Sequence, residues 1–361
     1  MLNIEKKYIK REIFEKIASH LDKPEITLIT GSRQVGKTVL LEQLKNYLVN
    51  KKKVSKDLIL YYNLDLVQDW EDLQDQTKFI EFLKDRSQKQ KIYVFIDEAQ
   101  KVPEAARFFK GIYDTKLNVK LVLTGSSSLE IKAKFKETLA GRKMLFYVSS
   151  FTFLEFLRCK DSVLINYFLK NGKKINEIDQ KKMVRHYKEY ITFGGYPRVV
   201  LSKTKEDKIN ILKEIYSSYI EKDAIGFLAI KNKAAFNRLI KLLAAQVGQL
   251  VNIEELASNL NIDRHSVERY IFALEESFIV KRVVPYYKNP RQEIVKANKV
   301  YFLDCGIRNL SLENFEDLDE RTDRGLIFEN AVFSALLFLQ ETGITKLHFW
   351  RTKQKTEVDF V

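Results

Sequence analysis

The residues with the clearest chemistry form a glycine-rich stretch near the N-terminus. Glycines tolerate backbone conformations that let successive N–H groups point at one phosphate, and a following helix adds its positive N-terminal end. Lys37 would place its charge on the β- and γ-phosphates, and the Thr38 hydroxyl would bind Mg²⁺. The stretch predicts a binding site for ATP with Mg²⁺, formed by Gly31, Ser32, Arg33, Gln34, Val35, Gly36, Lys37 and Thr38.

An acidic pair follows an apolar run later in the chain. Residues 92–96 are all apolar or aromatic, and Asp97 and Glu98 come directly after them. A buried strand that ends in this way places Asp97 at the carboxyl edge of a parallel sheet, where it can hold the Mg²⁺ shell. Glu98 is suited to orient or deprotonate the attacking water. Alone, the pair would indicate a solvated helix start, but after a phosphate loop it predicts the second half of a hydrolytic site.

Further side chains are candidates for the same site, each with a plainer alternative. Ser126, and after it Thr124, could sense the γ-phosphate or position water, and the alternative is a helix N-cap. Arg142 could place positive charge on the transition state, in its own subunit or a neighbour's, or be an exposed surface arginine. Arg33 could contact nucleotide or a partner subunit. We predict catalytic roles for Glu98, Lys37, Arg142 and Ser126, and metal binding by Thr38 and Asp97.

A parallel sheet is needed to bring these residues together. Apolar runs of strand length lie at residues 26–30, 58–62, 92–96, 120–124 and 144–148, and helical patterns separate most of them. Such runs are typical of parallel strands covered by helices on both faces. A helix over residues 39–48 would follow the loop. An opening helix is also expected, because Ile9, Ile13, Ile17 and Leu21 recur every four residues.

The chain changes character after residue 151. Residues 151–240 are mostly helical in pattern. Residues 253–260 and 264–277 predict two helices joined by a short turn with Asp263 as N-cap, and residues 279–285 and 297–303 are β-like. This order predicts a winged helix-turn-helix, which would serve either DNA contact or packing and regulation. For DNA contact, the predicted residues are Arg264, His265, Ser266, Glu268 and Arg269 in the groove, with Lys288 and Arg291 on phosphates.

The amino-acid composition limits the classes of binding partner and the cellular compartment that we expect. Lys and Arg number 62 against 48 Asp and Glu, and the net charge of +14 favours either a polyanionic partner such as nucleic acid or a lysine-rich solvated surface. The 2 cysteines and 4 histidines are too scattered for a disulfide framework or a zinc site. No apolar segment is long enough to cross a bilayer, so we expect a cytoplasmic protein without a membrane partner.

Together these stretches resemble the AAA+ P-loop ATPases, and most of all a prokaryotic subgroup whose ATPase module precedes a C-terminal domain of unknown function. The resemblance implies ATP binding, ATP hydrolysis and often a nucleic-acid connection. Ser150 stands where the family usually has proline. The resemblance covers essentially the whole chain and is carried by residues 31–38, 95–100, 123–127, 139–142, 151–156, 194–197, 219–223 and 301–306.

The last segment resembles the beginning of a PD-(D/E)xK nuclease-like fold. Glu329 lies in an apolar helical pattern over residues 325–339, and Asp359 lies in an expected strand. In such nucleases these carboxylates and a following Glu-x-Lys strand hold Mg²⁺. The sequence stops at Val361 without that strand. We therefore expect a partial domain with structural carboxylates, unless the native gene continues.

The sequence predicts an α/β P-loop ATPase domain (residues 1–157), a helical lid or connector (158–247), a winged helix (248–310) and a truncated α+β nuclease-like segment (311–361). Our first hypothesis is a Mg²⁺-dependent ATPase that couples nucleotide state to the winged helix, with DNA as a candidate partner and a homo-oligomer as a candidate assembly. One alternative is a switch that binds DNA or protein without hydrolysing nucleotide. The other is the ATPase part of a mobile-element or defence nuclease.

Overall fold

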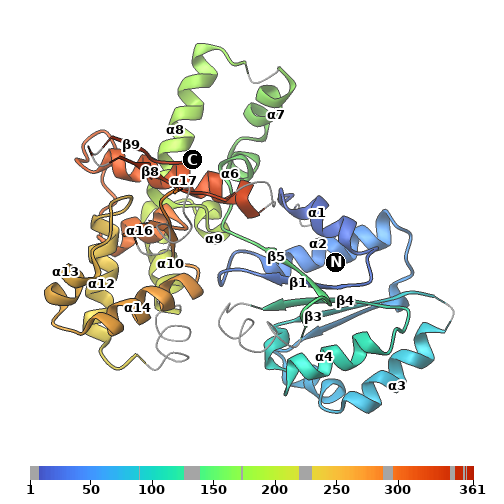
Figure 1. Ribbon diagram of the computed structural model, residues 1–361. Coiled ribbons are helices and arrows are strands. Elements are labelled where there is room, and N and C mark those ends of the chain that lie inside the picture. The colour runs from blue at the N-terminus through green and yellow to red at the C-terminus, as the bar shows by residue number, and fades with distance from the viewer. Residues whose placement is uncertain are drawn as a thin grey trace. The chain divides into compact units, whose positions relative to one another are not determined.

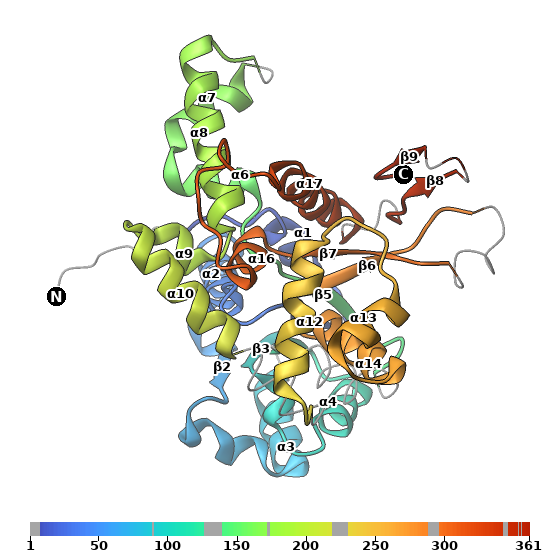
Figure 2. The same ribbon diagram turned by 90° about the vertical axis from the view of Figure 1, so that its left-hand side faces the viewer.

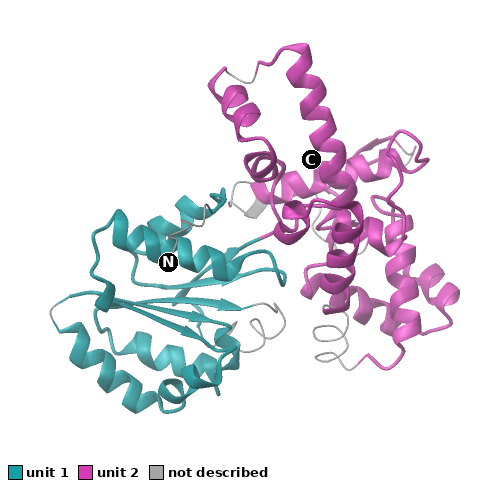
Figure 3. Cartoon of the chain, turned by 180° about the vertical axis from the view of Figure 1, so that it is seen from behind, with its two compact units in different colours: residues 1–148 teal, residues 149–361 magenta. Residues whose placement is uncertain are grey.

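The computed structural model describes residues 8–88, 90–125, 139–171, 174–218, 230–287, 296–341, 346–352, 354 and 356–361. The chain divides into two units, residues 1–148 and 149–361 (Figure 3). The predicted division into four parts stays a prediction. Among the described residues, no helix combines the length and the apolar character that crossing a lipid bilayer requires.

The first unit is an α/β structure built on one parallel sheet. Its elements are β1 (Ile26–Thr30), β2 (Ile59–Asn63), β3 (Ile92–Asp97), β4 (Val119–Gly125), β5 (Lys143–Tyr147), α1 (Phe14–His20), α2 (Lys37–Asn50), α3 (Gln76–Ser87), α4 (Ala105–Asp114) and the 3₁₀ turns η1 (Lys56–Leu58), η2 (Val67–Leu73) and η3 (Ala99–Lys101). The strand order is β2-β3-β4-β1-β5, and every pairing is parallel, which confirms the predicted fold class. Helices α1 and α2 cover one face of the sheet, and α3 and α4 cover the other (Figure 1).

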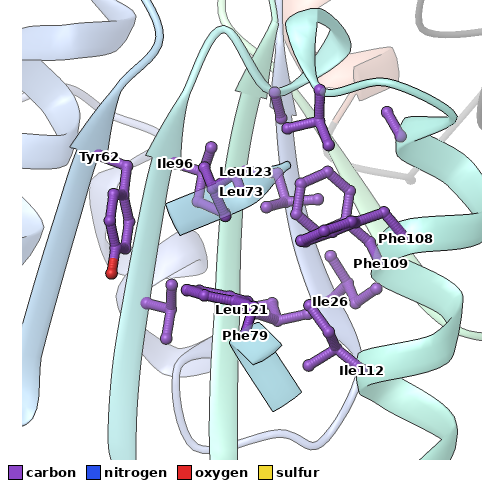
Figure 4. Close-up of a cluster of buried hydrophobic side chains, with 14 of the residues drawn as sticks. Ile26, Tyr62, Leu73, Phe79, Ile96, Phe108, Phe109, Ile112, Leu121 and Leu123 are labelled. Atoms are coloured by element: carbon purple, nitrogen blue, oxygen red, sulfur yellow. The ribbon is translucent and has the colours of Figure 1, made fainter. Parts of the chain in front are cut away.

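An apolar core lies between the sheet and the α3–α4 layer. Strands β1 and β3 are buried along their whole length because helices cover both faces of the sheet. Figure 4 shows Ile96 and Leu123 from two neighbouring strands in one cluster with Phe108 and Phe109 of α4. This packing fixes the carboxyl ends of the strands, from which the predicted site residues extend.

The opening helix is shorter than its periodicity predicted. Helix α1 begins at Phe14, and Ile9 lies before it with its carbonyl accepting a hydrogen bond from Gln43 Nε2 at 2.9 Å. Ile17 and Leu21 are fully buried, as their spacing predicted. A repeat of apolar residues indicates which side chains face the core, but it does not fix the residue at which a helix begins.

The second unit is mostly helical. Its elements are α6 (Phe153–Lys160), α7 (Ser162–Lys170), α8 (Glu177–Phe193), α9 (Pro197–Leu201), α10 (Lys205–Ser218), α12 (Lys233–Ala245), α13 (Ile253–Leu260), α14 (Arg264–Glu276), α16 (Cys305–Ser311), α17 (Arg324–Glu341), β6 (Val280–Val283), β7 (Lys299–Phe302), β8 (Trp350–Arg351) and β9 (Glu357–Val358). Helices α12, α13 and α14 pack together, and α14 packs on β6 (Figure 2). Strands β6 and β7 pair antiparallel, as do β8 and β9. Helices α13 and α14 and the β6–β7 pair follow in the predicted order, and their identity as a winged helix stays a prediction.

Candidate nucleotide-binding site

The loop between β1 and α2 requires glycine at its first position. A Cβ atom on Gly31 would lie 2.0 Å from the carbonyl oxygen of Val148, so a side chain has no room there. Gln34 and Gly36 have left-handed backbone, with φ of 59° and 94°. The loop is therefore a tight turn that ends at the N-terminus of α2, where backbone N–H groups and the helix dipole attract an anion.

Lys37 is folded back over this loop. It is the first residue of α2 and is 6% exposed. Its Nζ donates to the carbonyl oxygen of Gly31 at 3.0 Å and to that of Ser32 at 2.8 Å. The ammonium group is thus held at the loop itself, within reach of an anion that binds there.

A chain of hydrogen bonds joins the loop to the neighbouring strand ends. Thr38 Oγ1 donates to Asp97 Oδ2 at 2.6 Å, and Thr124 Oγ1 donates to Asp97 Oδ1. Thr124 Oγ1 also accepts from the backbone N–H of Glu98 at 3.1 Å. β1 pairs with β4, and β4 pairs with β3, so the carboxyl ends of all three strands meet at one edge. The structure brings Thr38, Asp97, Glu98 and Thr124 together, as a hydrolytic site requires.

Glu98 has a strained backbone directly after β3. Its φ of 57° and ψ of 45° are left-handed, a conformation that costs a residue with a Cβ roughly 1 to 2 kcal/mol. Gln100 Nε2 donates to Glu98 Oε2 at 2.5 Å, and Gln100 is 4% exposed. Strain of this kind concentrates at functional sites. Gln100 is not among the predicted site residues, and its one signal in the sequence is its position two residues after Glu98.

Strand β2 contributes Tyr61, which is also not among the predicted site residues. Burial, followed by the negative charge of Asp97, raises the pKa of Tyr61 well above its ordinary value. The Lys45 ammonium group of α2 lies 3.7 Å from the centroid of the Tyr61 ring. Tyr61 is therefore a neutral phenol at the carboxylate of Asp97 and links β2 to α2.

Arg142 lies at the opposite edge of the sheet. It directly precedes β5, and its carbonyl accepts from the N–H of Ile26 at 2.8 Å, where β1 begins. The phosphate loop follows the other end of β1, and the 5 residues of that strand span about 16 Å. Arg142 Nε pairs with Asp114 Oδ1 at 2.8 Å. This placement does not fit the predicted role in its own subunit, so the role in a neighbour's site and the alternative of a surface arginine both stay predictions.

Other predicted site residues are not tested by this geometry. Ser126 lies outside the described residues. Arg33 and Gln34 are half-buried in the loop, whereas Ser32 and Val35 are buried. Roles for Ser126 and Arg33 stay predictions.

In the second unit, the helix predicted to read DNA begins as expected. Asp263 caps α14 by accepting from the N–H of Ser266 at 2.9 Å. Arg264 forms an exposed ion pair with Glu254 at 3.2 Å. Within the same unit, the family motif at residues 219–223 lies outside the described residues.

Ion pairs occupy other charges on that helix. Glu268 pairs with Arg282 of β6 at 2.9 Å, and Glu275 pairs with the same guanidinium group at 2.7 Å. His265 and Arg269 are exposed. The predicted wing residues Lys288 and Arg291 lie outside the described residues. Contact with DNA through this helix stays a prediction.

The carboxylates that resemble a nuclease centre surround a lysine. The Lys299 side chain of β7 is 2% exposed, and its Nζ lies 3.3 Å from Glu329, 2.6 Å from Glu357 and 2.9 Å from Asp359. Tyr301 Oη donates to Glu329 at 2.6 Å. Nowhere in the described part of the chain do three or more His, Cys, Asp or Glu residues form a group that could hold a metal ion. The ammonium group already neutralises these carboxylates, which favours the expected structural role.

Comparison with known proteins supports the reading of the first unit. Residues 23–157 match a family model described as an AAA domain, and residues 184–319 match a model described as a domain of unknown function. An uncharacterized protein of Haemophilus influenzae is 28% identical over 318 residues, which cover 84% of this chain and 73% of that protein. An uncharacterized protein of Methanocaldococcus jannaschii is 27% identical over 371 residues, covering 98% and 75%.

Among solved structures, the Aeropyrum pernix ORC1 protein in complex with DNA is similar with a TM-score of 0.34 and 11% identity, covering 83% of this chain and 91% of that one. The family match and the geometry of the loop together support an AAA+ P-loop ATPase domain in the first unit, and with it nucleotide binding.

Proposed function

We propose that this chain is a Mg²⁺-dependent ATPase whose nucleotide state is coupled to its second unit. The observation that carries the proposal is the 2.6 Å hydrogen bond between Thr38 and Asp97, which joins the phosphate loop to the acidic end of β3. A phosphate loop alone supports nucleotide binding. A loop joined to Asp97 and Glu98 supports hydrolysis as well.

The residues at this edge fit a magnesium ion. The Thr38 hydroxyl and the Asp97 carboxylate are oxygen ligands, and Mg²⁺ in nucleotide sites takes one or two protein ligands together with phosphates and water. Thr38 and Asp97 would hold the ion, which neutralises charge on the phosphates when bound.

Each remaining residue has a role that its position favours. Lys37 would exchange its contacts with the loop carbonyls for the phosphate oxygens of ATP. Glu98 would orient the attacking water and accept its proton, while Gln100 holds the Glu98 carboxylate and Thr124 holds the Glu98 backbone. Arg142 of a neighbouring copy is the proposed source of further positive charge in the transition state.

Support for the coupling comes from the short connection after β5. The N–H of Val148 donates to the carbonyl oxygen of Thr30 at 2.7 Å, and the Val148 carbonyl abuts Gly31 of the phosphate loop. Only Ser149 separates Val148 from Ser150. The Ser150 side chain hydrogen-bonds to the carboxylate of Asp304 in the second unit. We infer that a displacement of the loop is passed along this short connection.

In the second unit, the residues around Asp304 are tightly packed. Asp304 accepts from the N–H groups of Gly195 and Gly306, each at 2.9 Å. A Cβ on Gly194 would lie 2.0 Å from the Asp304 carboxylate, and a Cβ on Gly195 would lie 2.3 Å from the carbonyl oxygen of Phe151. We call the set Ser150, Phe151, Gly194, Gly195, Asp304 and Gly306 the Asp304 joint. The close contacts within the Asp304 joint favour a set of residues that transmits a displacement instead of deforming.

The second unit contains the candidate DNA-binding module. The net charge of the whole chain, +14, favours either a polyanionic partner or a lysine-rich solvated surface. The ion pairs of Arg264 and Arg282 favour the alternative of a packing or regulatory module. A gel shift at low salt, with and without ATP, separates the two, because binding through phosphate contacts weakens steeply with salt. Absence of any shift at low salt removes DNA from the proposal.

Hydrolysis is tested by Glu98→Gln, with Glu104→Gln as the matched control. Glu104 also has left-handed backbone, with φ of 47°, and its exposed carboxylate pairs with Arg107 at 3.4 Å. We expect Glu98→Gln to slow phosphate release by about 100-fold or more, the usual contribution of a general base, while ATP binding is retained. Glu104→Gln should match the wild type. If the wild type releases no phosphate with or without DNA, the chain is a non-hydrolysing switch.

A further inference from the structure

A short segment before α1 is bound to both the phosphate loop and the helix that follows it. Arg11 Nη1 donates to the carbonyl oxygen of Val35 at 2.8 Å, and Arg11 is 6% exposed. Two residues earlier, the carbonyl of Ile9 accepts from Gln43 Nε2 of α2 at 2.9 Å. We call residues 9–11 the N-terminal strap. The strap lies outside the glycine-rich motif, so the motif alone gives no sign of it.

Val35 lies at the turn of the phosphate loop, where its carbonyl group needs a donor. It stands between Gln34 and Gly36, whose φ values of 59° and 94° are both left-handed, and it is completely buried. A loop that turns its N–H groups toward a phosphate turns carbonyl groups outward, and a buried carbonyl without a donor is costly. Arg11 supplies that donor through a charged group, which makes the stronger kind of hydrogen bond.

Packing keeps the strap in place. Phe14 at the start of α1 lies edge-to-face against Tyr47 of α2, with ring centroids 5.8 Å apart, and Figure 1 shows the two helices side by side. Ile13 is buried directly after the strap. The backbone that carries Arg11 is therefore held against α2, the helix that begins with Lys37. From this position the Arg11 guanidinium group reaches the phosphate loop.

The charge of Arg11 adds to the effect of its hydrogen bond. Guanidinium groups stay protonated in proteins. A nearly buried positive charge at the phosphate loop acts on a bound triphosphate through surroundings of lower dielectric than water. Arg11 does not need to touch the nucleotide for this.

We propose that Arg11 is a positioning residue of the nucleotide site, which holds the Val35 carbonyl and so keeps the phosphate loop in the shape that receives ATP. This inference rests on the proposed function, since it assigns a residue to the same site. It makes the N-terminal strap part of that site, although the strap carries no recognised motif.

The test measures the dissociation constant for Mg²⁺-ATP by titration calorimetry in the whole 361-residue chain. Arg11→Met should weaken binding by about 10-fold or more, because it removes a charged donor from a buried carbonyl. Arg11→Lys keeps the charge and should recover part of the loss. Lys10→Met is the matched control: it removes the neighbouring cation, whose pair with Glu15 is exposed at 64% and 66%, and binding should stay as in the wild type.

Thermal unfolding without nucleotide separates positioning from a purely structural role. A structural residue would lower the melting temperature while the folded protein binds ATP as the wild type does, and that result overturns the inference. Arg11→Lys carries the test if Arg11→Met does not fold. Equal affinities of wild type, Arg11→Lys and Arg11→Met overturn the inference but leave the proposed function intact. A wild type that does not bind Mg²⁺-ATP overturns both.

Discussion

At the scale of single residues, Gly31 of the phosphate loop packs directly against the carbonyl group of Val148, the residue after β5. Gly31→Ala would place a Cβ 2.0 Å from the Val148 carbonyl oxygen, so either the loop or the end of β5 must move. We expect affinity for Mg²⁺-ATP, measured by calorimetry, to fall about 10-fold or more. Gly325→Ala is the control, because nothing lies within 4 Å of its added Cβ. Unchanged affinity in Gly31→Ala would show that the loop tolerates the shift.

His20 gives the first unit a pH dependence. Burial, followed by the positive charge of Lys120, lowers the pKa of His20 to about 4. Because this lies below the value of about 6.5 in an unfolded chain, the unfolded state binds more protons between pH 4 and 6.5. The free energy of unfolding should therefore rise with pH across this window, by about 2 kcal/mol.

Urea denaturation at pH 4.5 and pH 7 measures this difference. His20→Gln should reduce it, since the titrating group is gone. His265→Gln, which changes an exposed histidine of α14, should leave it as in the wild type. An equal pH dependence in His20→Gln and wild type would contradict the assignment.

Several candidate site residues, whose roles stay predictions, could be proposed from sequence because their chemistry lies in a local pattern. Lys37, Thr38, Asp97 and Glu98 follow a glycine loop or a buried run, and both signals are continuous in sequence. Gln100 and Arg11 could not be predicted in this way. Their roles depend on hydrogen bonds made after folding, and Arg11 reaches a carbonyl 24 residues away.

At the scale of elements, the five apolar runs of the first unit predicted its strands to within a residue or two. Their parallel pairing followed from the helices between them. Register was not predictable, and register decides that Thr124 meets Asp97. Arg142 falls at the opposite edge because it precedes β5, which runs parallel to β1. The motifs at Gly194 and Asp304 were visible in sequence, but their meeting in the Asp304 joint was not.

The joint leads to a prediction about the connection after β5. Inserting Gly-Ser-Gly-Ser between Ser149 and Ser150 leaves both ends of the connection anchored but makes it flexible. We expect ATP hydrolysis to persist. In wild type, ATP should change amide hydrogen exchange at Gly195 and Gly306, whose N–H groups bind Asp304. The insertion should abolish that change. Equal responses in both proteins, or no response in wild type, would argue against coupling through this connection.

At the scale of the whole molecule, the position of Arg142 bears on assembly. Its pair with Asp114 leaves it 33% exposed, at the edge opposite its own phosphate loop. If Arg142 completes a neighbour's site, phosphate release per chain should rise with protein concentration. Inactive Arg142→Ala chains should then lower the rate of wild type by more than dilution does.

Arg107→Ala is the control for that mixing experiment, because its side chain is 82% exposed and pairs only weakly with Glu104 at 3.4 Å. It should leave the mixture at the rate expected from dilution. A rate per chain that does not change with concentration, together with full activity of Arg142→Ala alone, would remove Arg142 from the catalytic set.

Hydrolysis at the edge formed by the phosphate loop and β3 is the central claim, and a single-turnover assay tests it most directly. Protein in excess over radiolabelled ATP is followed for phosphate release with Mg²⁺, with EDTA, and with Lys37→Ala in place of wild type. We predict release by wild type with Mg²⁺, and none in the other two cases. Release that is equal with EDTA or in Lys37→Ala, or its absence from wild type with Mg²⁺, would contradict the claim.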